Sequence, residues 1–175
     1  MLAGFGYAPE QTTEYIDEMS RIEPLLSAYN DYDWYGKLYR QAGMDETLQV
    51  IELIESSSYP ELVKAIIEVE STWRTNALSF MDARGLMQIR PIAAYEVVPD
   101  LDIADLYDPV INVQIGIAIF EAHMDFFTEY NETEHWALTA YNRGRQGTFN
   151  LKQAPPRTTY SHKVLDLKLH TWSSA

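Results

Sequence analysis

One glutamate in the sequence occupies a position that suits acid–base chemistry. Residues 60–71 have the pattern of an amphipathic helix, in which apolar side chains recur with a period of 3.6 residues, and the continuation of this apolar stripe leads to Glu70. Glu68 falls on the opposite, polar face, together with Glu61 and Lys64. Burial and the negative end of the helix dipole both disfavour a charge on Glu70, so we expect its pKa to be raised. A carboxylic acid that keeps its proton near neutral pH can serve as a general acid; the alternative interpretation is a structural carboxylate paired with a buried cation.

The elements that must position Glu70 are predicted to be helices nearly throughout the chain. Periodicity, capping residues, prolines and glycines predict helices over 33–41, 46–58, 60–71, 110–130, 135–142 and 158–172, and a short helix near Pro91. The stretch 72–84 shows no helical period and is expected to be a loop, with a very small β-hairpin in 74–84 as the alternative. Residues 1–44 are expected to form an N-terminal helical extension, with its first helix near 14–22. We therefore predict an all-α fold.

The composition argues against several classes of protein. The chain has 26 acidic and 13 basic residues and a formal net charge of −13, which disfavours binding to nucleic acid or to anionic membranes. No apolar run approaches the roughly 20 residues that span a bilayer, and the first residues lack the features of a signal peptide. Cysteine is absent, and the histidines lack the spacing of metal ligands, so we expect no metal and no cofactor.

Short motifs follow Glu70 in an order that is typical of one enzyme family. They are Glu70-Ser71, Ser79, Gly85-Leu86-Met87-Gln88-Ile89, Pro91, Asp108-Pro109, Asn112, Gly116, Ala140-Tyr141-Asn142, Gly144, and Tyr160 ahead of Val164-Leu165. Each motif alone is weak, but their order and spacing together are specific. Over about residues 46–170 the chain resembles the soluble lytic transglycosylases, which have a lysozyme-like catalytic domain related to goose-type lysozymes.

The resemblance implies a fold, a substrate and a reaction. A lysozyme-like domain is expected over residues 45–175, acting on the glycan strands of peptidoglycan. Members of the family cleave the β-1,4 bond between N-acetylmuramic acid and N-acetylglucosamine and leave a 1,6-anhydromuramyl product. By this resemblance, Glu70 protonates the glycosidic oxygen and then accepts the proton of the muramyl 6-hydroxyl, which attacks C1. The N-acetyl group of the substrate would stabilise the positively charged intermediate, so that no second carboxylate is needed.

Six further residues are expected at the substrate, also by resemblance. Ser79 would hydrogen-bond near the N-acetyl group, and Tyr141 would place its hydroxyl close to Glu70. The residues with these and the remaining expected binding roles are Ser79, Met87, Gln88, Tyr141, Asn142 and Tyr160. Within this set, the middle pair of the Gly-Leu-Met-Gln-Ile motif would line the cleft, and the tyrosine near the C-terminus matches the aromatic residue that closes the family's domain.

Asp82 supports an alternative reaction. A hydrolase with two carboxylates needs a second acid roughly 5–10 Å from the first. Aligned on the shared motif, the second carboxylates of goose-type lysozymes fall at about Ser79 and Arg90, and neither residue is acidic. Asp82 stands where the family usually has glycine. It is either a turn residue or, together with Glu70, part of a hydrolytic muramidase (lysozyme).

The lack of an export signal leads to a hypothesis about location. Peptidoglycan lies in the periplasm or cell wall, so a bacteriophage protein, carried in the virion or released at lysis, would reach it without a signal. The extension 1–44 would then dock to other virion or tail proteins through its many aromatic side chains, which often dominate interfaces. The alternative outside enzymes is a non-catalytic virion assembly protein that retains the domain.

Overall fold

The computed structural model describes residues 34–172 of the 175-residue chain. The chain divides after Asp33, and the unit that begins at Trp34 consists of helices joined by loops. Its helices are α2 (Trp34–Ala42), α3 (Met44–Ser56), α4 (Pro60–Glu70), α5 (Pro91–Val97), the 3₁₀-helix η1 (Ile103–Tyr107), α6 (Pro109–Phe126), α7 (Thr133–Phe149), α8 (Thr159–Leu167) and the π-helix η2 (Lys168–Trp172). The predicted helix near residues 14–22 lies outside the described residues.

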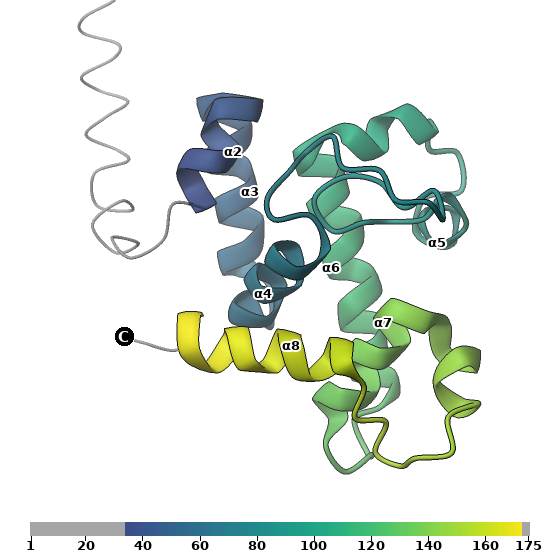
Figure 1. The fold of residues 1–175 in the computed structure, drawn as a ribbon. Coiled ribbons are helices and arrows are strands. Elements are labelled where there is room, and N and C mark those ends of the chain that lie inside the picture. Colours follow the sequence, from purple (N-terminus) through teal and green to yellow (C-terminus); the bar gives the residue numbers. More distant parts are fainter. Residues whose placement is uncertain (1–33, 173–175) are drawn as a thin grey trace, which may run out of the picture. The chain divides into compact units, whose positions relative to one another are not determined.

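The long helix α6 is at the centre of this unit (Figure 1). It packs against α3, α5, η1 and α7, while α4 packs against α3, α8 and η2. The central position of α6 agrees with its composition, because its sequence is apolar on nearly all sides and a helix of this kind must be buried. Phe120 in α6, Ile66 and Ile67 in α4, and Ile54 in α3 are fully buried where these helices meet.

Local signals explain where most of the helices begin. Proline occupies the first turn of α4, α5 and α6, where its missing N–H costs no helical hydrogen bond. Asp108 caps α6, since its side chain accepts hydrogen bonds from the N–H groups of Val110 and Ile111. Gly43 follows α2 with a φ of 83° and a ψ of −174°, a conformation that is open essentially to glycine alone, and its N–H donates to the carbonyl of Tyr39. The predicted helix over 135–142 is the first part of α7, which continues beyond a kink at Gly144, where the backbone is not helical.

The predicted loop after α4 contains isolated β-bridges in place of a hairpin. Leu78 pairs with Arg84, and Arg84 pairs with Ile89, and no β-strand occurs within residues 34–172. The buried side chain of Asn112 in α6 fixes the loop to this helix by hydrogen bonds. It accepts a hydrogen bond from the Met87 N–H at 2.8 Å and donates to the carbonyls of Arg84 and Leu106 at 2.8 and 2.7 Å.

The assignment of Lys64 to the polar face of its helix is wrong. Its side chain is only 5% exposed and forms an ion pair with Glu55 of α3 at 3.2 Å. Because α3 and α8 both pack against α4, little of the α4 surface is left to solvent. A periodic pattern shows which stripe of a helix is apolar, but it does not show how many neighbours surround the helix.

The predicted domain boundary after residue 44 falls one residue into α3. Helix α2 packs on α3, and its Trp34 is 2% exposed. Residues 34–42 thus belong with the rest of the described unit, and docking by residues 1–44 stays a prediction. None of the helices in the described part of the chain is both long enough and apolar enough to cross a membrane.

Candidate active site

Glu70 is the last residue of α4, and its carboxyl group is largely withdrawn from solvent. Burial raises its pKa from 4.5 to about 7, although the hydrogen bond from Tyr160 and the charge of Lys163 act in the opposite direction. This is the shift expected from the position of Glu70 on the apolar stripe. The carboxyl is therefore partly protonated at neutral pH, so it can give a proton to a substrate and afterwards take one back.

Two tyrosines stand near Glu70 in different roles. Tyr160, from the first turn of α8, donates its hydroxyl hydrogen to Glu70 Oε1 at 2.7 Å. Tyr141, from α7, donates instead to the carbonyl of Met87 at 2.8 Å. Burial raises the pKa of both hydroxyls well above 10, and the charge of Glu70 raises each of them further. Both hydroxyls therefore stay protonated and act as donors, and it is Tyr160 that bonds directly to Glu70.

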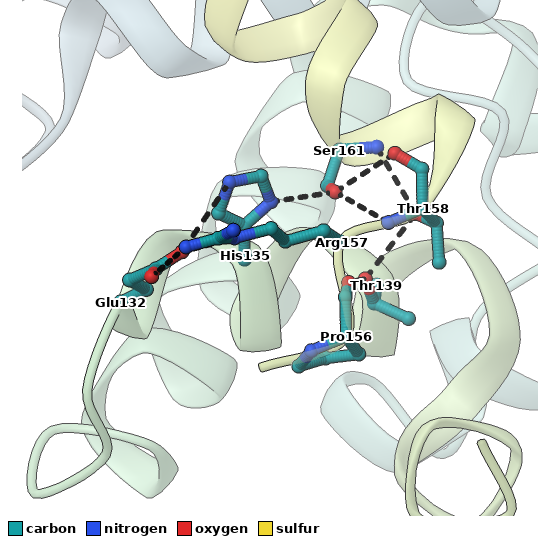
Figure 2. A network of polar contacts seen from close by, with 7 residues as sticks. All are labelled: Glu132, His135, Thr139, Pro156, Arg157, Thr158 and Ser161. Atoms are coloured by element: carbon teal, nitrogen blue, oxygen red, sulfur yellow. Dashed lines mark hydrogen bonds and ion pairs between the residues drawn. The ribbon is translucent and has the colours of Figure 1, made fainter. Parts of the chain in front are cut away.

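A network of polar contacts fixes the start of α8 and so the position of Tyr160. Figure 2 shows these contacts between the N-terminal ends of α7 and α8. Thr158 and Ser161 form a capping box, and the Ser161 hydroxyl also lies 2.8 Å from His135 Nδ1. Thr139 donates to the carbonyl of Pro156 at 2.8 Å, while Arg157 pairs with Glu132. Because Tyr160 lies between the two capping residues, this network sets where its ring enters the site.

The loop between α4 and α5 carries Ser79 and Gln88. The Ser79 hydroxyl oxygen accepts hydrogen bonds from the N–H groups of Met81 and Ala83 at 3.2 and 3.0 Å. The Gln88 amide nitrogen donates to the carbonyls of Ala77 and Gly85 at 3.1 and 3.0 Å. These contacts leave the Ser79 hydroxyl hydrogen and the Gln88 amide oxygen for a ligand.

Two other predicted residues differ in exposure. Met87 is 0% exposed, and its side chain lies over Gly116, where an added Cβ would overlap its sulfur. Met87 thus presents no side-chain surface for a cleft, contrary to the prediction, and reaches the site through its carbonyl to Tyr141. Asn142 is exposed on α7 next to Tyr141.

Asp82 has the environment of a turn residue. It adopts a φ of 60° at the tip of the loop, and its N–H donates to the Ser79 carbonyl. Its carboxylate is 54% exposed and pairs with Arg84, whose Nε donates to Asp82 Oδ1 at 2.9 Å. Arg90 is exposed and precedes the first turn of α5. The contacts of this exposed carboxylate are those of a surface ion pair within the loop, so they favour the turn interpretation.

Two contributors to the site had no role assigned from the sequence. Lys163 lowers the pKa of Glu70 from α8, one helical turn beyond Tyr160. Asn112 connects the loop to α6. It is one of the family motifs in the sequence, but no role was assigned to it there. The spacing of Tyr160 and Lys163 at i and i+3 on one predicted helix was the available signal. Among residues 34–172, no three histidine, aspartate or glutamate side chains lie together in a way that could hold a metal ion.

Sequence comparison identifies relatives over part of the chain. The family model of the transglycosylase SLT domain matches residues 52–162. The chain is 32% identical over 85 residues to the transglycosylase of Enterobacteria phage PRD1, covering 49% of this chain and 29% of that protein. It is 45% identical over 64 residues to the membrane-bound lytic murein transglycosylase E of Buchnera aphidicola subsp. Baizongia pistaciae (strain Bp), covering 32% of this chain and 30% of that protein. The chain thus spans less than a third of the length of these curated relatives.

Structural comparison agrees on the fold. The crystal structure of the 70 kDa soluble lytic transglycosylase from Escherichia coli superposes with a TM-score of 0.55 at 21% identity, covering 67% of this chain and 23% of that one. This likeness confirms the predicted all-α, lysozyme-like architecture. The family model matches well over half of the chain, from α3 to α8, and includes Glu70. The chain belongs to the family of the transglycosylase SLT domain.

Proposed function

We propose that the protein is a peptidoglycan lytic transglycosylase in which Glu70 alone acts as acid and base. The observation that carries this proposal is the Glu70 carboxyl itself, which is buried at the end of α4, receives the Tyr160 hydroxyl, and has a pKa of about 7. Family membership and the names of both curated relatives, a transglycosylase and a lytic murein transglycosylase, support the reaction class.

The proposed reaction needs no water and no second carboxylate. Glu70 gives its proton to the glycosidic oxygen as the bond from that oxygen to muramyl C1 breaks. The resulting carboxylate takes the proton of the muramyl 6-hydroxyl, whose oxygen forms the new bond to C1. The product is a 1,6-anhydromuramyl end, and Glu70 is protonated again. Tyr160 supports both steps, because a hydroxyl donor serves the neutral carbonyl oxygen and the carboxylate alike.

Two loop residues are proposed to hold the sugar. The Ser79 hydroxyl hydrogen would be donated to the N-acetyl oxygen, since the hydroxyl oxygen already accepts two backbone hydrogen bonds. The Gln88 amide oxygen would accept from a sugar hydroxyl, since its nitrogen is engaged by Ala77 and Gly85. Asn142 would contact the substrate from the exposed end of the Tyr141 segment.

Mass spectrometry of digested sacculi tests the reaction. Anhydromuropeptides, each lighter by one water than the hydrolysis product, are expected from the wild type and absent with Glu70→Gln. Glu68→Gln is the matched control, because Glu68 lies on the same helix two residues earlier, 28% exposed and 4.0 Å from Lys37. Lysis by Glu70→Gln, at the level of the control, would remove the central role of Glu70. Reducing muropeptides, lost on Asp82→Asn, would establish the hydrolytic muramidase instead.

We also propose that the protein opens the cell wall locally for a bacteriophage. The transglycosylase of phage PRD1 among its relatives supports this origin. Residues 1–44 would then attach the enzyme to other virion or tail proteins. Mass spectrometry should detect the protein in purified virions. It should not detect the protein in virions made with a chain that lacks residues 1–33. If the full-length protein is absent from virions, it is instead an enzyme released at lysis. If it is stably incorporated but does not lyse sacculi, it is instead an assembly protein.

A further inference from the structure

The turn that follows Glu70 has an unusual backbone. Thr72 and Trp73 have φ values of 52° and 63°, so two consecutive residues other than glycine adopt the left-handed conformation. This region is disfavoured for side chains of their size and persists only where surrounding contacts impose it. The turn begins two residues after Glu70, so the contacts that hold it also define the C-terminal end of α4.

Gln41 of α2 supplies such contacts. Its amide nitrogen donates to the carbonyl of Trp73 at 2.8 Å, and its amide oxygen accepts from the N–H of Thr75 at 3.0 Å. One side-chain amide thus bonds to both a carbonyl and an N–H group of this segment, as a neighbouring backbone peptide group would. The nitrogen also donates to the carbonyl of Lys37, four residues earlier, which holds the amide against its own helix.

An aromatic stack joins the same two elements. Trp34 of α2 lies on Trp73 with ring centroids 4.3 Å apart and an angle of 27° between the planes. Both rings are buried. The Trp73 indole nitrogen has no hydrogen-bond partner among the described residues, so packing determines where this ring lies. Helix α2 thus holds residue 73 through its side chain and its carbonyl together.

The element that makes these contacts lies outside the family match. The match begins at residue 52, whereas α2 ends at Ala42. The residues that α2 contacts in α4 and in the following loop, Glu68, Trp73 and Thr75, lie inside the matched region. Helix α2 therefore lies outside the matched region and contacts the part of it that follows Glu70.

We propose that α2 clamps the turn after Glu70 and that Gln41 is a positioning residue for the catalytic carboxylate; this rests on the acid–base role proposed above for Glu70. The last turn of a helix frays because its carbonyl groups lack partners within the helix. Here the N–H groups of Ser71 and Thr72 donate to the carbonyls of Ile67 and Glu68, so the helical hydrogen bonds of α4 run directly into the left-handed turn. Gln41 and Trp34 keep it, and so they hold the Glu70 side chain in its buried position.

The test compares Gln41→Ala with Gln49→Ala in the full chain. Gln49 is an exposed glutamine of α3 whose amide donates to the carbonyl four residues earlier, as that of Gln41 does, but it makes no contact with the turn. For Gln41→Ala we expect kcat on soluble glycan strands to fall about tenfold or more with KM little changed, because a displaced catalytic group costs turnover. In an NMR titration of the Glu70 carboxyl, the midpoint should fall in Gln41→Ala, as the group gains access to water. Gln49→Ala should match the wild type in both measurements.

The outcomes separate the clamp from the proposed function. Wild-type kcat and an unchanged Glu70 midpoint in Gln41→Ala would overturn the clamp. So would a loss of activity that only follows the folded fraction, measured by near-UV circular dichroism, with the midpoint unchanged. Activity in Glu70→Gln would instead overturn the proposed function. In that case the NMR midpoint still decides whether Gln41 holds the Glu70 carboxyl in place, because the titration does not depend on turnover.

Discussion

Three influences act on the Glu70 carboxyl, and burial is the strongest of them. The Tyr160 hydrogen bond and the Lys163 charge both favour the carboxylate, yet the pKa still rises to about 7. A group with this pKa near the working pH changes protonation state with little cost in either direction. The opposing contributions explain how one residue can serve as acid in the first step and as base in the second.

The pH dependence of activity should follow this value. The free enzyme must hold a proton on Glu70 to begin the reaction, so kcat/KM is expected to be constant below pH 7. It should fall about tenfold per pH unit above it, as the proton is lost. Initial rates on glycan strands between pH 4.5 and 9 measure the profile. A bell-shaped profile, whose acid limb disappears in Asp82→Asn, would contradict the single-residue mechanism and favour a second, ionised carboxylate.

Removal of the Tyr160 hydroxyl should shift that profile. In Tyr160→Phe the hydrogen bond that lowers the Glu70 pKa is lost, so the alkaline limb should move to higher pH. We also expect kcat to fall about tenfold or more, since hydrogen bonds to charged groups contribute roughly 1.5–3 kcal/mol. The matched variant is Tyr141→Phe, because the Tyr141 hydroxyl that it removes donates to the carbonyl of Met87 and not to Glu70. Equal shifts in the two variants would show that the two hydroxyls share one role.

At the level of elements, the loop between α4 and α5 depends on its junction with α6. Asn112 makes three hydrogen bonds there, and Gly85 lies directly against its side chain with a φ of 74°. A Cβ at residue 85 would overlap both the Asn112 amide and the Leu106 carbonyl. Residue 85 must therefore be glycine for two reasons: its positive φ, and the close packing of Asn112 and Leu106 against its Cα.

Gly85→Ala should separate these two requirements when compared with Gly144→Ala. Both glycines have a φ of 74°, but an added Cβ at Gly144 has no atom within 4 Å. We expect Gly144→Ala to cost roughly 1–3 kcal/mol of unfolding free energy, because its φ of 74° and ψ of 158° lie in a region that is open essentially to glycine alone. Gly85→Ala should cost more, about 4 kcal/mol, or prevent folding. Urea denaturation followed by circular dichroism measures both. Equal losses would mean that the loop moves aside without cost.

At the level of the whole molecule, Glu70 should make stability depend on pH. The folded state retains the Glu70 proton up to about pH 7, whereas the unfolded chain releases it near 4.5. Free energy of unfolding therefore falls as pH rises between these values, and the full loss, on the order of 3 kcal/mol, applies above pH 7.

Glu70→Gln should remove this loss. The variant is expected to match the wild type near pH 4.5 and to unfold at a higher temperature at pH 8, because it carries no buried charge and its amide oxygen still accepts from Tyr160. Thermal unfolding across this range measures the difference, with Glu68→Gln as the control for loss of a charge on the same helix. A difference that does not grow with pH would show that the folded protein does not hold the Glu70 proton.

Much of the fold and one feature of the site follow from interactions between near neighbours in the chain. Helical periodicity, prolines at first turns, the aspartate cap of α6 and the glycine after α2 place most elements, because each acts within a few residues. The same periodicity places Glu70 on a buried stripe and predicts the direction of its pKa shift. The motif order in turn predicts the family that the comparisons confirm.

What only the tertiary structure decides are contacts between residues far apart in the sequence. The Tyr160 hydroxyl reaches Glu70 across 90 positions, and Gln41 reaches Thr75 across 34. The burial of Lys64 and Met87, and the three bonds of Asn112, likewise depend on which helices pack together. Periodicity and caps act along the chain and carry no information about these partners. The sequence by itself therefore determined an acid on an apolar helix face, and packing decided which groups surround it.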